Sequence, residues 1–150
     1  MANTYTQLFV HIIFSTKGRE KVLLKDFREE LYKYISGILD HKNQKPFAVN
    51  GAIDHIHILV GIEPNISVSD LVRDIKHSST NFIKEKNFIK HKFNWQKGYG
   101  AFTYSKSQID SVVKYIMNQE GHHKQKSFEE EYLEFLKKFD VDYDSKYVFD

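Results

Sequence analysis

Residues 54–60 read Asp-His-Ile-His-Ile-Leu-Val, and this stretch decides how the chain folds. Successive side chains of a β-strand point to opposite faces of its sheet. His55 and His57 therefore share one face, whereas the two isoleucines share the other and supply a hydrophobic core. The alternation predicts a strand over 55–62 that is apolar on one side and carries two imidazoles on the other.

Three further strands and four helices are predicted around this one. The strands follow from alternation and β-branched content, and the helices from apolar residues at helical spacing. Three of the helices begin at a serine suited to cap a helix, namely Ser67, Ser107 and Ser127. The turn that leads into the histidine strand could lie a few residues either way. The strands are predicted at 7–15, 47–54 and 99–104, and the helices at 25–41, 67–83, 107–119 and 127–139.

The order of elements is β-α-β-β-α-β followed by two helices. This order predicts an α+β fold of the ferredoxin-like, RRM-like split β-α-β type, with a four-stranded antiparallel sheet and helices packed on one face. Residues 1–150 show no internal repeat or linker, so a single domain is expected. The fold alone indicates little about function, because this scaffold serves many unrelated activities.

The composition excludes several classes of protein. With 0 cysteines among 150 residues, the chain has no disulfide, no thiolate zinc site and no cysteine nucleophile. A full α/β barrel needs about 250 residues and is excluded by length. No apolar run is long enough to cross a bilayer and no signal peptide is visible. A cytoplasmic protein without a membrane partner is therefore expected.

Two pairs of residues carry the chemistry. Two neutral imidazoles side by side, as at His55 and His57, form half of a metal site, although a solvated pair of histidines is an equal alternative. Tyr115 and Gln119 lie one turn apart on the helix predicted at 107–119. A phenol in that position could act as a nucleophile beside an amide oxygen that binds metal. Taken alone, the second pair also fits an amphipathic tyrosine at a helix boundary.

Four segments together resemble a known family. They are the His-Ile-His strand, Trp-Gln-Lys-Gly-Tyr-Gly-Ala-Phe at 95–102, Tyr-Ile-Met-Asn-Gln at 115–119 and Ser-Phe-Glu-Glu-Glu at 127–131. In this order and spacing they resemble the single-tyrosine HUH transposases of the IS200/IS605 insertion sequences and their repeat-associated relatives. The resemblance covers almost the whole chain.

The resemblance implies a metal-dependent enzyme that cleaves and rejoins single-stranded DNA with hairpin ends. His55, His57 and Gln119 match the metal ligands, with Mg²⁺ or Mn²⁺ as the cofactor, and Tyr115 matches the nucleophile that forms a 5′-phosphotyrosine. Members of the family act as homodimers, so Tyr115 is expected to complete the site of the partner. Exchanging one phosphodiester for another needs no nucleotide fuel, and the sequence contains no Gly-rich phosphate loop.

The charge distribution suits a polyanion. Residues 126–150 hold 4 lysines and 8 acidic groups, a net charge of −4, so the total of +2 leaves +6 on residues 1–125. Lysines alternate with aromatic residues between 82 and 97, a pattern suited to phosphates and splayed bases. A solvated lysine-rich loop with its aromatics in the core is an equal alternative. The candidate DNA contacts are Lys17, Arg19, Lys90, Lys92, Trp95 and Lys97.

Three other functions are weighed against a transposase. A domesticated relative would keep the nicking chemistry and lack an element to move. A binding module would use the sheet without catalysis, and replacing Tyr115 would then change nothing. A metal-dependent hydrolase would use the two histidines with water and form no covalent protein–DNA species. The transposase is favoured, because water hydrolysis gives no reason for the pair Tyr115 and Gln119.

Overall fold

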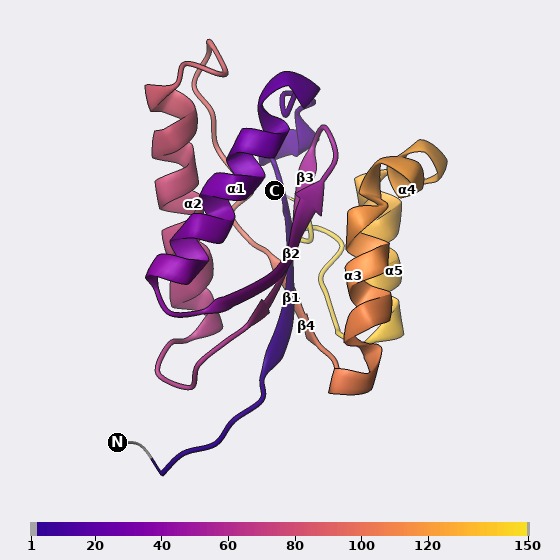
Figure 1. The fold of residues 1–150 in the computed structure, drawn as a ribbon. Helices are drawn as coiled ribbons and strands as arrows, with labels where there is room; N and C mark the ends of the chain where they lie inside the picture. Colours follow the sequence, from indigo (N-terminus) through magenta and orange to yellow (C-terminus); the bar gives the residue numbers. More distant parts are fainter. Residues whose placement is uncertain (1–2, 150) are drawn as a thin grey trace.

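An antiparallel four-stranded sheet forms the centre of the molecule (Figure 1). The computed structural model describes residues 3–149, and residues 1, 2 and 150 of the predicted domain lie outside the described part. The strand order is β2-β3-β1-β4, as predicted for the split β-α-β fold. The strands are β1 (Phe9–Ser15), β2 (Lys45–Gly51), β3 (His55–Gly61) and β4 (Gly100–Thr103).

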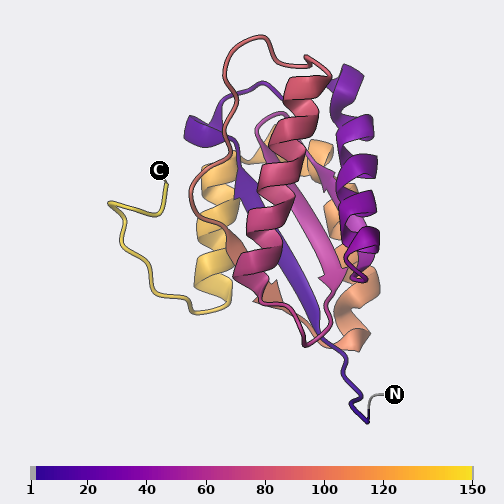
Figure 2. The ribbon, with the colours of Figure 1, turned by 90° about the vertical axis from the view of Figure 1, so that its left-hand side faces the viewer.

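Helices α1 (Lys25–His41) and α2 (Val68–Glu85) cover one face of the sheet (Figures 1 and 2). The apolar side of the histidine strand packs against these two helices, as predicted. Alternate side chains of β3, which are Ile56, Ile58 and Val60, all point to this face of the sheet. Ser67 accepts a hydrogen bond from the Asp70 backbone at 3.0 Å, which caps α2 as predicted. The buried core on this side includes Ile12, Phe14, Leu31, Ile35, Ile56, Ile58, Val60, Leu71 and Ile75.

The opposite face is covered by α3 (Ile109–Met117), α4 (Gln119–Gln125) and α5 (Phe128–Lys138) (Figure 1). The prediction that helices pack on one face alone is therefore wrong. The reason is that the strands also carry buried apolar side chains on this second face, including Ile13 and Leu59. A sheet that is apolar on both faces must be covered on both.

The predicted third helix is divided in the structure. It begins with a 3-10 turn at Lys106–Gln108, and Ser105 forms the capping box with Gln108, so the prediction of Ser107 as the cap is wrong. The α-helix ends at Met117, where Asn118 has φ −101° and ψ 27°. Gln119 then begins α4. The prediction of one continuous helix through residue 119 is therefore also wrong.

A tight turn over residues 52–54 joins β2 to β3 and delivers His55 to the start of its strand. Ala52 donates its backbone N–H to the His55 carbonyl at 3.0 Å. A Cβ atom built on Gly51 would lie 2.1 Å from the same carbonyl oxygen, far inside van der Waals contact. Glycine at this position therefore lets the two strands approach closely enough for the turn to close.

Replacing Gly51 by alanine should destabilise the protein by about 2 kcal/mol or more, because backbone atoms must move to admit the methyl group. The matched control is Gly37→Ala in the middle of α1, where a Cβ meets nothing within 4 Å. That substitution should stabilise the helix by about 0.5–1 kcal/mol. Urea unfolding of the three proteins measures both effects. Equal stabilities would contradict the close approach at Gly51.

Candidate metal and nucleophile site

Strand β3 places both predicted histidines between the sheet and the second helical layer. His55 is 1% exposed and His57 is 0% exposed. Their rings lie 5.1 Å apart between centroids. Because both imidazoles are buried, the alternative of a solvated pair is wrong for this chain. Buried polar rings need hydrogen-bond partners, and these partners define the site.

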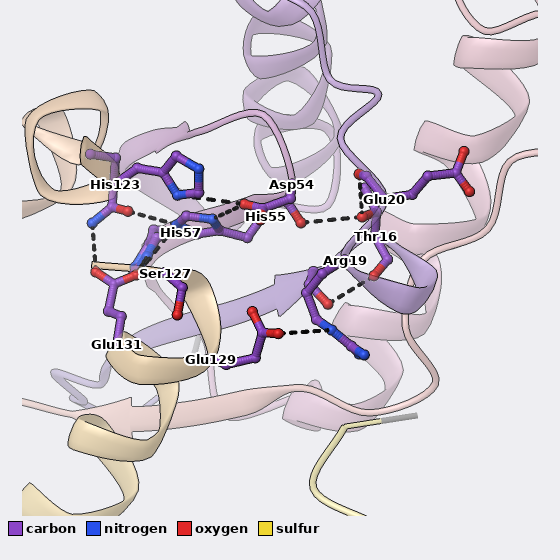
Figure 3. A network of polar contacts seen from close by, with 12 residues as sticks. Thr16, Arg19, Glu20, Asp54, His55, His57, His123, Ser127, Glu129 and Glu131 are labelled. Atoms are coloured by element: carbon purple, nitrogen blue, oxygen red, sulfur yellow. Dashed lines mark hydrogen bonds and ion pairs between the residues drawn. The ribbon is translucent and has the colours of Figure 1, made fainter. Parts of the chain in front are cut away.

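His55 lies between two acceptors. Its Nδ1 is 2.8 Å from a carboxylate oxygen of Asp54 (Figure 3). Its Nε2 is 2.7 Å from Oε1 of Gln119. Burial alone would lower the pKa of His55. The hydrogen bonds to the carboxylates of Asp54 and Glu131 outweigh burial and raise this pKa to about 9. Without a metal ion, His55 is therefore an imidazolium that donates from both nitrogens.

His57 has a different environment. Its Nδ1 lies 2.8 Å from Nε2 of His11, a buried residue of β1, and Nδ1 of His11 lies 3.3 Å from the Tyr104 hydroxyl. Burial lowers the pKa values of both His57 and His11, so these rings are neutral near pH 7. A neutral imidazole is the form that binds a metal. With a metal ion bound at Nε2, the proton of His57 would lie on Nδ1 and be donated to His11.

Tyr115 and Gln119 reach the same place from the second helical layer. The Tyr115 ring lies 6.0 Å from the His57 ring and stacks on His122 at 4.4 Å between centroids. Gln119, the first residue of α4, is fully buried. The structure therefore brings together, within one chain, all four residues that the sequence singled out. Whether a second copy exchanges its Tyr115 with this site stays a prediction.

No role was predicted from the sequence for Glu131 of α5, which lies at the centre of the site. Its Oε1 lies 3.2 Å from Nε2 of His57 and 3.3 Å from Nε2 of His55 (Figure 3). Its Oε2 accepts hydrogen bonds from the Tyr115 hydroxyl and, at 3.0 Å, from the Gln119 amide. Burial alone would raise the pKa of Glu131, but hydrogen bonds from the two histidines hold it well below its ordinary range.

A signal for this residue was present in the sequence. Phe128, Tyr132 and Phe135 form the buried stripe of α5, and residue 131 falls on the same stripe. A carboxylate on the apolar face of an amphipathic helix is seldom buried without a partner. The acidic run at 129–131 hid this signal, because acidic residues in the first turn of a helix are ordinary there.

The donor atoms fit a divalent metal ion. Ligands bound at about 2.1 Å and separated by 90–109° lie roughly 3.0–3.4 Å from one another. The distances from the Nε2 atoms of His55 and His57 to Glu131 Oε1, 3.3 and 3.2 Å, lie in this range. His55 Nε2 and Gln119 Oε1 are closer, at the hydrogen-bond distance of 2.7 Å. Imidazole nitrogens with amide and carboxylate oxygens are a mixed set that suits Mn²⁺ and Mg²⁺ as well as Zn²⁺.

The nucleophile candidate is held as a phenol. Burial, and then the negative charge of Glu131, raise the pKa of Tyr115 well above the ordinary value of a tyrosine. A divalent cation beside Glu131 would offset that negative charge and lower the same pKa. The pKa of Tyr115 would therefore depend on whether the site holds a cation.

Three of the six candidate DNA contacts gather on one edge of the molecule. Lys17 shares a hollow of about 70 Å³ with Lys92 and a larger one of about 690 Å³ with Lys97. Lys76 holds this edge in place, since its Nζ lies 2.7 Å from the carbonyl oxygens of Gln96 and Gly98. The backbone pairing of Thr16 with Trp95 joins the two segments that carry these lysines.

The remaining candidates have other surroundings. Trp95 is 6% exposed, packs edge-on against Phe14 and donates its indole N–H to Ser79 at 3.0 Å. Its ring therefore belongs to the core and is covered on the side where a base would stack. Arg19 lies 3.8 Å from Glu129 of α5, in a hollow that also contains Lys21, Lys124 and Lys126. Lys90 is exposed on the loop after α2.

This chain belongs to the IS200-like transposases, because the family described as "Transposase IS200 like" matches residues 4–119. The transposase for insertion sequence element IS200 of Salmonella typhimurium strain LT2 is 25% identical over 127 residues, covering 80% of this chain and 84% of that protein. The ISDra2 transposase TnpA of Deinococcus radiodurans is 25% identical over 120 residues, covering 75% of this chain and 84% of that protein.

Solved structures show the same fold. A crystal structure of a transposase from Deinococcus radiodurans R1 superposes with a TM-score of 0.65 at 23% identity and covers 79% of this chain and 95% of its own. A structure of the REP-associated tyrosine transposase bound to a REP hairpin has a TM-score of 0.60 at 17% identity. The match covers 82% of this chain and 73% of that chain. Within residues 3–149, no helix has the length and apolar character needed to cross a membrane.

Binding of Mn²⁺ to the free protein should release close to one proton per ion near neutral pH. The reason is that His55, with its pKa raised to about 9, must lose its Nε2 proton to become a ligand. The affinity should therefore rise roughly tenfold per pH unit up to about pH 9 and then level off. Calorimetric titrations in buffers of different ionisation enthalpy count the protons.

Asp54→Asn provides the comparison for this titration. It removes a carboxylate that raises the pKa of His55, so the variant should release fewer protons per ion at the same pH. Binding of Mn²⁺ without proton release in the unmodified protein would mean that His55 is already neutral, and would contradict the prediction.

Proposed function

We propose that this protein cleaves and rejoins single-stranded DNA through a covalent 5′-phosphotyrosine on Tyr115, with a divalent ion held by His55, His57 and Gln119. The observation that supports this most strongly is the convergence of a phenol, two imidazoles and an amide oxygen in one buried site. They come from β3, α3 and α4, which share no local sequence reason to meet. Membership of a transposase family supports the same reaction.

The proposed reaction exchanges one phosphodiester for another. The Tyr115 oxygen attacks the phosphorus, the new tyrosyl–phosphate bond forms, and the bond to the 3′ oxygen breaks. The 3′ end leaves as a hydroxyl, which takes up one proton, while the phenol has lost one. Rejoining is the same step with a DNA hydroxyl as the attacking group. The energy of the bond is conserved, so no nucleotide cofactor is required.

The protonation state of the Tyr115 hydroxyl contributes to the activation barrier of the proposed reaction. With an ordinary pKa of about 10, only about one tyrosine in a thousand is ionised at pH 7. Deprotonating the phenol at this pH therefore costs about 4 kcal/mol of free energy. Burial and Glu131 make the phenolate of Tyr115 scarcer still. A bound Mg²⁺ or Mn²⁺ ion would polarise the scissile phosphate and neutralise the charge that develops. His122, stacked on the Tyr115 ring, limits the positions the ring can adopt.

The proposed substrate is single-stranded DNA with hairpin ends. The edge that contains Lys17, Lys92 and Lys97 would bind its phosphates, and the related REP-associated transposase is described as bound to a hairpin. A second copy of the chain is the proposed protein partner. Before Tyr115 could enter a partner's site, its hydroxyl would have to leave Glu131 of its own chain.

End-labelled single-stranded DNA carrying an element end, incubated with the protein and Mn²⁺, should yield a labelled band at the mass of the protein on a denaturing gel. Tyr115→Phe should abolish this band, because it removes the attacking oxygen and leaves the ring. His57→Ala should abolish it by removing a metal ligand. Tyr34→Phe is the matched control, since Tyr34 is half exposed and stacks on Phe82 on the opposite side of the sheet.

Two outcomes would contradict the proposal. Cleavage that forms no adduct and survives Tyr115→Phe would indicate a metal-dependent hydrolase that uses water. Binding of the DNA element end without cleavage, equal in all four proteins, would indicate a nucleic-acid-binding module.

A further inference from the structure

We propose that Glu131 of α5 is a fourth protein ligand of the metal ion, which makes the C-terminal helix part of the catalytic centre. This inference rests on the metal assistance included in the proposed function. The stretch that matches the transposase family ends at Gln119, so Glu131 lies beyond the matched residues.

The position of the Glu131 carboxylate supports this role. Its Oε1 lies 3.2 Å and 3.3 Å from the Nε2 atoms of His57 and His55, which are the spacings of neighbouring ligands around one ion. One ligand atom from each of the three residues lies within 4.8 Å of the others. The carboxylate is within hydrogen-bonding distance of both imidazoles, and the same spacing would let all three side chains bind one ion.

The electrostatics of the site point to a cation. Glu131 is 6% exposed, and a buried carboxylate is costly unless an opposite charge lies beside it. Within residues 3–149, the side chains bonded to its oxygens are those of two histidines, Tyr115 and Gln119, with no lysine or arginine. Of these groups only protonated His55 carries a positive charge, and a divalent cation held by Oε1 would take its place opposite the carboxylate.

The second oxygen of Glu131 arranges the other members of the site. Oε2 accepts from the Gln119 amide nitrogen at 3.0 Å, so the amide oxygen of Gln119 must face His55. The same oxygen accepts from the Tyr115 hydroxyl. One carboxylate thus connects the metal position, the third expected ligand and the nucleophile.

Helix α5 is built to hold this side chain still. Ser127 and Glu130 form a capping box at its start, and Phe128 and Tyr132 are buried on either side of Glu131 along the same face. Glu129 occupies the same turn but points to the surface, where it lies 3.8 Å from Arg19 (Figure 3). Glu129 therefore offers a matched control with the same chemistry and no contact with the site.

The test is calorimetric titration of the whole 150-residue chain with Mn²⁺ alone, without DNA. Glu131→Gln should weaken Mn²⁺ binding at least about tenfold, because an anionic ligand becomes a neutral amide of the same size. Glu129→Gln should change the affinity less than about twofold. His57→Ala shows the effect of losing a ligand at the same site. Circular dichroism and urea unfolding of each variant show whether it is folded.

Glu131→Asp extends the test in case the glutamine variant does not fold. It keeps the buried negative charge but withdraws the carboxylate by one methylene group, so Mn²⁺ binding should again weaken. Unchanged or tighter binding in a folded Glu131 variant would overturn the proposal, because the carboxylate would then be a competitor of the ion. Absence of Mn²⁺ binding to the unmodified protein would overturn both this proposal and the metal assistance. Binding that depends on Glu131 without any covalent DNA adduct would sustain this proposal and overturn the proposed function alone.

Discussion

The alternation of side chains along β3 is the constraint on which the rest of the structure depends. Its isoleucines enter the core beneath α1 and α2, so His55 and His57 are forced into the layer on the other side of the sheet. Those imidazoles are then covered by the C-terminal helices and must find partners there. One face of β3 thus contributes to the polar site, and its opposite face contributes to the hydrophobic core.

The second layer combines apolar packing with a buried polar network. Phe128, Phe135 and Ile116 fill the space around the histidines, and the carboxylates of Asp54 and Glu131 stand on either side of His55. Each polar group in such a network depends on the others, since removing one leaves its neighbour buried and unpaired. The site is therefore also a structural element that fastens α5 to the sheet.

Much of this arrangement was predictable from local pattern. Alternation and helical spacing predict the strands and helices, and their order along the chain predicts the sheet that the structure has. Alternation also singles out His55 and His57, whereas the roles of Tyr115 and Gln119 came from the resemblance of four segments to the transposases. Two features could not be predicted in this way, namely the helices on both faces of the sheet and the position of Glu131 in the site. Both depend on how distant segments pack, and a local sequence pattern does not encode long-range packing. Trp95 illustrates the same limit, because an aromatic residue among lysines has the same local sequence whether it stacks on a base or fills a core.

The break at Asn118 has a mechanical consequence. In one continuous helix, Tyr115 and Gln119 would move as a rigid unit, one turn apart. Asn118 instead ends α3, and its carbonyl accepts the His122 N–H at 3.1 Å to start the next helix. The tyrosine and the glutamine therefore belong to two bodies joined by a single residue. Rotation about the backbone of that residue would let the Tyr115 ring shift while Gln119 stays in place.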